Sequence, residues 1–309
     1  MKKQQLLADV SLLFVAFIWG ATFVLVQNAV ALLEPFTFNA VRFGLAGLFL
    51  IAWLLIFKRN IISSLNKKLL LSGFIMGTWL FAGYALQTFG LLYTTSSKAG
   101  FITGLSVVLV PLFGFLFLKE TPKRFAVFGV GIATIGLYLL TLGDSLALNI
   151  GDVLVFFCAI SFAAHIVVTG KYTPFYSTLW LTIVQILTVS LLSGISALIF
   201  EDWQRVFDSS VMGSFNVMIA LVICSFFATA IAFLAQTNFQ KFTTPTRVAL
   251  IFAMEPVFAA ITAFFWADER LGANALMGCL LIFIGMILAE LPQKTFEGLL
   301  KNKRSYEVK

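Results

Sequence analysis

The sequence contains two copies of one unit, and this internal repeat constrains the fold more than any other feature. From Gln87 to Leu139 each position corresponds, without a gap, to the position 149 residues later. The matched pairs at this offset include Gln87-Thr88 with Gln236-Thr237, Thr94-Thr95 with Thr243-Thr244, Glu120 with Glu269, Gly129 with Gly278, and Gly136 with Gly285. Nearer the N-terminus the offset is 143 residues, which pairs Asp9 with Asp152, Ala16 with Ala159, Ala21 with Ala164, and Arg42 with Gln185. The repeat predicts two units, residues 1–148 and 149–292, and a tail over 293–309.

Each unit is built of apolar stretches long enough to cross a membrane. The 309 residues are 60% hydrophobic and only 11% charged, whereas soluble domains carry roughly 25% charged residues. About 20 apolar residues cross a bilayer as a helix. We expect ten spans, at about 9–29, 36–57, 69–92, 99–118, 124–142, 152–171, 177–200, 212–239, 247–266 and 271–291. Five spans per unit force the second unit to cross in the opposite direction. The predicted fold is therefore an all-α integral membrane protein with ten transmembrane helices in two inverted five-helix repeats.

The basic residues predict the orientation of these spans. With the N-terminus in the cytoplasm, 17 of the 21 Lys and Arg residues fall in cytoplasmic segments. Only Lys98, Arg205 and Arg270 fall outside, and Arg42 lies within a span. Cytoplasmic loops are enriched in Lys and Arg, so both termini and the tail are expected in the cytoplasm. Because the net charge of +7 is spread over the ends of the spans, we expect membrane lipids and no nucleic acid as a partner.

Several classes of protein are not favoured by the sequence. Cys158, Cys224 and Cys279 all lie inside apolar spans without the spacing of metal ligands, so we expect neither a disulfide framework nor a metal site. The chain has one histidine and no phosphate-binding GxxxxGK[ST] motif. We therefore expect no cofactor and no enzyme activity. The first span could be mistaken for a cleavable signal peptide, but its repeat partner, Asp152–Lys171, cannot be one, so we expect the span to be retained.

Local motifs along nearly the whole chain carry a family resemblance. They are Trp19-Gly20 in the first span, Arg42-Phe43 in the second, Pro111 with Lys119-Glu120 in the fourth, and Met254-Glu255-Pro256-Val257-Phe258 followed by Asp268-Glu269-Arg270-Leu271 in the ninth. The chain resembles the EamA-type branch of the drug/metabolite transporter superfamily. The resemblance implies a transporter of the bacterial plasma membrane that exports a metabolite, an amino acid or a drug-like solute. The second unit departs from the first where Trp19-Gly20 becomes Phe162-Ala163, Arg42 becomes Gln185, and Ser106 becomes Glu255.

Two ionisable residues near the middle of the membrane are candidates for function. Burial makes the ionised carboxylate of Glu255 costly, so it should face a cavity, find a partner or take up a proton. Pro256 has no N–H, which leaves the Phe252 carbonyl without its helical donor. Glu255 could bind solute, carry the coupled proton, or merely tie helices together. Arg42 could reach outward to the interface as an anchor, or hold a carboxylate of the solute or of the protein.

The expected solute-binding residues are Trp19, Arg42, Trp79, Tyr84, Gln87, His165 and Glu255. His165 is either a buried neutral ring that shares hydrogen bonds or, with Glu255, a second candidate for proton coupling. Gln87, Gln185 and Gln236 either link helices or contact the solute. Inverted repeats are typical of secondary transporters that bind solute near the midplane. The sequence thus predicts alternating-access transport of a small organic solute by a monomer or homodimer. A passive channel or facilitator and an integral-membrane enzyme are the alternatives.

Overall fold

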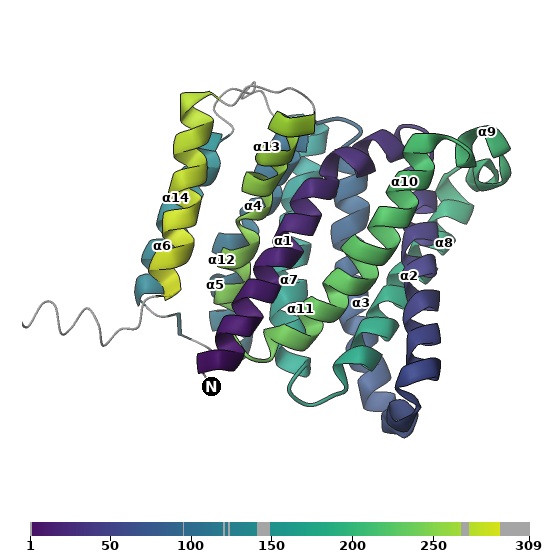
Figure 1. Cartoon of the computed structure of the whole chain (residues 1–309), viewed down its shortest axis with the longest axis horizontal. Helices are drawn as coiled ribbons and strands as arrows, with labels where there is room; N and C mark the ends of the chain where they lie inside the picture. The colour runs from purple at the N-terminus through teal and green to yellow at the C-terminus, as the bar shows by residue number, and fades with distance from the viewer. Residues whose placement is uncertain are drawn as a thin grey trace, which may run out of the picture.

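The computed structural model describes residues 2–94, 96–119, 121–122, 124–140, 149–266 and 272–290, and these form a bundle of helices (Figure 1). No strand occurs among them, which confirms the prediction of an all-α protein. The tail 293–309 and the Asp268-Glu269-Arg270-Leu271 motif lie outside the described residues.

The helices follow the predicted spans closely. The first unit holds α1 (Lys2–Val30), α2 (Pro35–Phe57), α3 (Lys67–Gly90), α4 (Ser96–Gly104) with α5 (Ser106–Leu118), and α6 (Arg124–Leu140). The second holds α7 (Ile150–Tyr172), α8 (Thr178–Phe200), α10 (Phe215–Ile223) continued by α11 (Ala232–Gln240), α12 (Pro245–Phe252) with α13 (Glu255–Trp266), and α14 (Ala273–Glu290). A π-helical segment, Cys224–Ile231, joins α10 to α11, and the short elements Arg59–Ser64, Trp203–Phe207 and α9 (Ser209–Met212) lie in the loops. Eight helical segments are long and apolar enough to cross a membrane, and α6 and α14 are shorter apolar helices.

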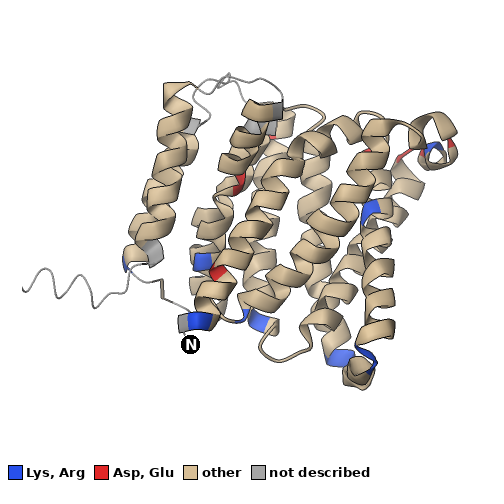
Figure 2. Cartoon of the chain, in the orientation of Figure 1, with Lys and Arg blue, Asp and Glu red and all other residues tan. Residues whose placement is uncertain are grey.

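The outer surface of the bundle is suited to lipid. Large apolar side chains point outward, among them Leu48 at 64% exposure, Phe117 at 70% and Phe128 at 65%. A soluble protein rarely exposes so much contiguous apolar surface, whereas lipid is the natural solvent for it. Lys and Arg gather at the end of the bundle where the N-terminus lies (Figure 2). This distribution agrees with a multi-pass membrane protein.

The helices α6 and α14 pack through glycines at matching positions of the two units. A Cβ on Gly136 would lie 2.7 Å from the Gly278 carbonyl oxygen, and one on Gly285 would lie 2.6 Å from the Gly129 carbonyl oxygen. The two contacts are equivalent under the repeat, because Gly129 corresponds to Gly278 and Gly136 to Gly285. The α6–α14 pair lies at one end of the bundle and the α2–α8 pair at the other (Figure 1). The remaining helices stand between these pairs.

Two of the spans bend at equivalent points. In the first unit, the Leu105 N–H bonds the Ile102 carbonyl at 3.1 Å, and in the second the Met254 N–H bonds the Ile251 carbonyl at the same distance. Each bond reaches back three residues instead of four, which is a tightened turn that interrupts the α-helix. The interruptions place Ser106 at the start of α5 and Glu255 at the start of α13. Both spans are therefore discontinuous near their middles.

Candidate functional site

A cavity lies between the two units, in the centre of the bundle. Its empty space amounts to about 790 Å³, part of which is open to the outside. Both units contribute to its wall. The polar part of the lining includes Arg42, Tyr84, Gln87, His165, Gln236 and Glu255, and the aromatic part includes Trp19, Phe23, Phe162, Phe233 and Phe252.

Six of the seven predicted solute-binding residues line this cavity, and Trp79 does not. The expectation for Trp79 requires correction, because its side chain is 40% exposed on the outside of α3. The inward face of α3 is formed by Leu80, Tyr84 and Gln87, which recur at the helical spacing of four and three residues. At about 100° per residue, Trp79 is turned away from that face.

Trp19 and Gly20 are neighbours in α1 but act on different partners. The Trp19 indole Nε1 donates to the Ala228 carbonyl oxygen at 2.8 Å, inside the π-helical segment. Its ring packs 5.2 Å from the Phe233 ring and 4.9 Å from the Phe252 ring, measured between centroids. Gly20 allows α1 to touch the backbone of the α12–α13 break, since a Cβ there would lie 2.4 Å from the Glu255 carbonyl oxygen. The Trp-Gly motif thus fixes one wall of the cavity.

Arg42 is buried, with 2% of its surface exposed. The interpretation of this residue as an anchor that reaches the membrane surface is therefore wrong. Its Nε donates to Thr229 Oγ1 at 2.8 Å, and its Cζ lies 4.9 Å from the centre of the Tyr84 ring and 5.3 Å from that of Phe43. Among the described residues no carboxylate forms an ion pair with it. Its guanidinium is therefore available to an anionic group in the cavity.

Glu255 lies on the opposite unit, at the first position of α13. In the described part of the chain its carboxyl has no hydrogen bond and no ion pair, although it lines the cavity. The interpretation of Glu255 as a tie between helices therefore has no contact to support it. The start of a helix is a favourable place for negative charge, because the first backbone N–H groups lack helical partners.

His165 is buried and hydrogen-bonded within the second unit. Its Nε2 lies 2.8 Å from Gln185 Oε1, and Gln185 Nε2 donates to Thr237 Oγ1 at 3.0 Å. The sequence left two roles for Gln185, linking helices or contacting the solute. These hydrogen bonds show that it links α8 to α7 and α11. Gln87 donates to Thr103 Oγ1 at 3.3 Å and also lines the cavity.

Some residues around the cavity were not singled out by the sequence. Thr229 holds Arg42, and Phe233 packs against the rings of Trp19, Phe43 and Tyr84. Among 35 phenylalanines nothing in the sequence marks Phe233. Thr229 has no polar counterpart in the first unit, where the equivalent residue is Leu80. That asymmetry was the only signal that could have found it.

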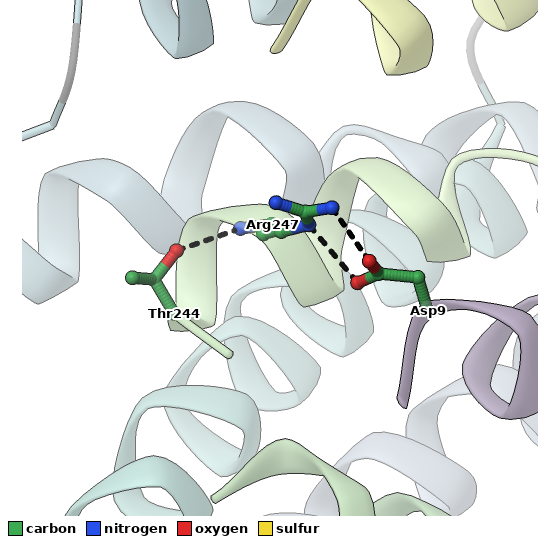
Figure 3. A network of polar contacts seen from close by, with 3 residues as sticks. All are labelled: Asp9, Thr244 and Arg247. Atoms are coloured by element: carbon green, nitrogen blue, oxygen red, sulfur yellow. Dashed lines mark hydrogen bonds and ion pairs between the residues drawn. The ribbon is translucent and has the colours of Figure 1, made fainter. Parts of the chain in front are cut away.

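An ion pair joins the two units at the end of the bundle that holds the N-terminus (Figure 3). Arg247 of α12 donates from Nε to Asp9 Oδ1 at 2.9 Å and from Nη2 to Asp9 Oδ2 at 2.5 Å. At the corresponding place in the other unit, Thr94 Oγ1 donates to Asp152 Oδ1 at 2.7 Å. Asp9 of α1 thus contacts the first turn of α12, and Asp152 of α7 contacts Thr94, which precedes α4.

The charged lining does not form a metal site. Within the residues that the structure describes, no three side chains of His, Cys, Asp or Glu come close enough to hold a metal ion. The cysteines Cys158, Cys224 and Cys279 are free thiols. The site consists of isolated polar groups in an aromatic wall, a composition common in pockets for small organic molecules.

Comparison with known proteins gives a consistent result. The EamA-like transporter family matches residues 6–142 and again residues 149–291. An uncharacterized transporter of Archaeoglobus fulgidus is 35% identical over 93% of this chain and 87% of its own length, and a second one from that organism is 26% identical over 89% and 94%. The uncharacterized transporter YvbV of Bacillus subtilis is 24% identical over 92% and 91%. A solved crystal structure that is 17% identical covers 92% of this chain and 95% of its own, with a TM-score of 0.77.

Proposed function

The chain belongs to the EamA-like transporter family, and on this premise we propose that it is a secondary transporter that exports a small organic solute by alternating access. The observation that carries the proposal is the central cavity, whose wall comes from both units and holds Arg42 and Glu255 without ionic partners among the described residues. Pockets that combine an apolar wall with a few polar groups bind small organic molecules. In a transporter this cavity is the solute site.

Ten spans in two inverted five-helix repeats are part of the proposal. The exchange of glycine contacts between α6 and α14 supports a pseudo-two-fold relation of the units. The matching interruptions at Leu105 and Met254 support it as well, because discontinuous helices commonly surround the site of inverted-repeat transporters. Rocking of one set of helices against the other would then expose the cavity to each side of the membrane in turn.

The membrane orientation follows from the distribution of charge. We place both termini in the cytoplasm of a bacterial cell and the protein in its plasma membrane, in agreement with the Lys and Arg residues at the end of the bundle near the N-terminus. The Asp9–Arg247 ion pair then closes the cytoplasmic end between the units. The contact between Thr94 and Asp152 lies at the outer end. Alternating access requires these two contacts to open at different times.

The solute is expected to carry an anionic group and an apolar body. Arg42 offers a planar, permanently charged fork that fits a carboxylate, and its charge has no carboxylate partner in the described structure. The aromatic wall of Trp19, Phe233 and Phe252 offers stacking surface for the apolar body. A carboxylate-bearing amphipathic metabolite, which includes amino acids and drug-like acids, satisfies both parts of the site.

Energy coupling is assigned to protons, with Glu255 as the main carrier and His165 as the second candidate. A carboxyl that faces the cavity without a partner can take up and release a proton as the cavity opens to each side. Glu255→Gln imitates the protonated form in nearly the same volume. We expect this variant to lose pH-driven uptake into vesicles while it keeps solute exchange. Unchanged pH-driven uptake would remove Glu255 from the coupling mechanism.

The proposal is tested by counterflow in proteoliposomes, with a panel of labelled carboxylate metabolites. Transport by the wild type should fall in Trp19→Ala and Arg42→Gln at equal reconstitution. Leu48→Ala is the matched control, because Leu48 lies on α2 like Arg42 but faces outward with 64% exposure. An equal loss in the control would mean that general destabilisation, and not the cavity, explains the effect.

Two other classes of function make different predictions in the same assay. A passive channel carries solute down its gradient but shows no counterflow against it, because counterflow requires a site that is exposed to one side at a time. An integral-membrane enzyme would release a chemically altered product, which mass spectrometry of the vesicle contents would detect. Counterflow of an unaltered solute excludes both.

A further inference from the structure

The two units contribute different charged and ring-nitrogen groups to the cavity. The first unit contributes a permanent donor, the Arg42 guanidinium. The second unit contributes Gln236, His165 and Glu255. The hydrogen-bond partners of Gln236 and His165 leave one polar atom of each side chain free, and with the amide orientations described below both free atoms are acceptors.

One polar atom of the Gln236 amide is hydrogen-bonded within the described structure, and the other is not. Its Nε2 donates to Gln240 Oε1 at 3.5 Å, and Gln240 Nε2 donates to the Ile166 carbonyl oxygen at 2.5 Å. Because a backbone carbonyl can only accept, Gln240 must turn its nitrogen toward Ile166 and its oxygen toward Gln236. Gln236 Oε1 is then left buried, and it has no partner among the described residues. A buried acceptor without a donor is costly, and because Gln236 lines the cavity, a donor group of a bound solute would satisfy it.

His165 has a similar arrangement. Gln185 donates from Nε2 to Thr237 Oγ1, so that its oxygen faces His165 Nε2 at 2.8 Å. With this orientation of the Gln185 amide the proton of the neutral ring is on Nε2, which also lies 3.4 Å from Thr169 Oγ1, and Nδ1 is an acceptor. In the described structure no donor reaches Nδ1, although the residue is 3% exposed and lines the cavity. A reversed Gln185 amide would make Nδ1 a donor instead, and the experiment below separates the two cases.

The first unit lacks the imidazole acceptor. Thr22 stands at the position of His165, and its hydroxyl donates to the carbonyls of Ile18 and Trp19. Gln87 stands at the position of Gln236 and, like it, uses its Nε2 within the protein, as a donor to Thr103 Oγ1. The amide acceptor is thus common to the two units, whereas the His165 acceptor belongs to the second unit alone.

We infer that Gln236 and His165 determine specificity by accepting hydrogen bonds from an N–H or O–H group of the solute, separate from the carboxylate that Arg42 holds. This inference rests on the proposed solute cavity and deepens it. The solute class becomes a carboxylic acid that also bears an amine or a hydroxyl group on an apolar body. Glu255, the third acceptor of the second unit, adds a preference for the amine when its carboxyl is ionised.

Three probes with one carbon skeleton test the inference. They are 4-methylpentanoate, which has no donor group beyond the acid, and its 2-amino and 2-hydroxy derivatives. Binding of the labelled probes to the purified full-length protein in lipid nanodiscs is measured by scintillation proximity. We expect the 2-amino or the 2-hydroxy derivative to bind at least about tenfold more tightly than 4-methylpentanoate. Comparison of the two derivatives shows whether the amine or the hydroxyl is preferred.

Variants then assign the preference to the two residues. Gln236→Leu and His165→Phe remove an acceptor and keep most of the volume, so each should weaken the preferred derivative by about tenfold and leave 4-methylpentanoate unchanged. Gln236→Glu restores an acceptor and should restore the preference. Ser193→Ala is the control, because Ser193 Oγ is also buried and without a partner in the described structure but does not line the cavity. It should change neither affinity.

Several outcomes would overturn the inference. One is equal binding of the three probes by the wild type. Another is a Gln236→Leu variant that weakens all three alike, which would give Gln236 a merely structural role. Weaker binding of 4-methylpentanoate to His165→Phe would make His165 a donor to the carboxylate. If none of the probes binds while counterflow of another solute persists, this inference fails and the proposed function stands. If no solute shows counterflow, the proposed function itself fails.

Discussion

Replacement of Gly20 by alanine should separate α1 from the break between α12 and α13. A Cβ at this position would lie 2.4 Å from the Glu255 carbonyl oxygen, 2.8 Å from Phe258 Cβ and 2.9 Å from the Ala259 nitrogen. Since real Cβ atoms essentially never approach closer than 3.0 Å, the two backbones must part by at least 0.6 Å, which is 3.0 minus 2.4. Two of the three obstructing atoms belong to the backbone, so no side-chain rotation can relieve the contact.

The loss of stability caused by Gly20→Ala is the difference between two opposing effects. Overpacking of a well-packed contact costs about 1–3 kcal/mol, and the higher helix propensity of alanine returns up to about 1 kcal/mol. Gly131→Ala is the matched control, because a Cβ there meets nothing within 4 Å and only the propensity effect remains. The difference between the two variants is therefore the strain alone.

The assay is thermal unfolding of both variants in the same detergent. We expect Gly20→Ala to melt about 2–10 °C below Gly131→Ala, by the usual relation between free energy and Tm. Because the strain acts on the residue that begins α13, solute affinity should fall in the same variant. Equal melting temperatures and equal affinities in the two variants would refute the packing that places Glu255 in the cavity wall.

Three further predictions concern the two ends of the protein and its surface. Asp9→Asn should weaken the contact with Arg247. A cytoplasmic thiol reagent should then modify a cysteine placed in the cavity by Ser106→Cys roughly tenfold faster. Asp202→Asn, which changes an exposed acid outside the cavity, should leave this rate unchanged. Trp79→Ala should leave solute affinity unchanged, whereas Trp19→Ala should lower it roughly tenfold, as measured by binding in nanodiscs. An impermeant thiol reagent on intact cells should label a cysteine at position 204 and spare one at position 302, and the opposite pattern would reject the proposed orientation.

The general architecture was predictable from the sequence because it depends on few, repeated quantities. The lengths of apolar stretches and the offsets of 149 and 143 residues suffice to locate the helices within a few residues. The interruption at Glu255 was foreshadowed by Pro256, which lacks the N–H of a continuous helix. The matching interruption at Leu105 has a weaker signal, because Pro111 lies six residues further along and only Gly104, directly before Leu105, marks the point.

The orientation of side chains within a helix was harder to predict. A soluble helix has a polar face that marks its outside, but a membrane helix is apolar on all sides. The wrong placement of Trp79 has this cause, since nothing in α3 distinguishes an aromatic residue that faces lipid from one that faces the cavity. For the same reason, the sequence could not decide whether Arg42 is an anchor at the membrane surface or a buried guanidinium. The burial of Arg42 and its contact with Thr229, which is far away in the sequence, decide the question.

The chemistry of the cavity arises where the two units differ. Positions that they share, such as Gln87 with Gln236 and Gly136 with Gly285, provide amide contacts and close helix packing on both sides of the pseudo-symmetry. Such equivalence would serve the proposed rocking motion, since inward-open and outward-open forms could then reuse one set of contacts. A solute with unlike ends needs a binding site whose two sides carry different groups. The two units differ in this way at three pairs of positions, since a cation, an imidazole and a carboxylic acid each stand on one side alone. The pairs are Arg42 with Gln185, Thr22 with His165, and Ser106 with Glu255. Under the proposed mechanism, a fold of two similar units can therefore move and yet hold its solute in a single orientation.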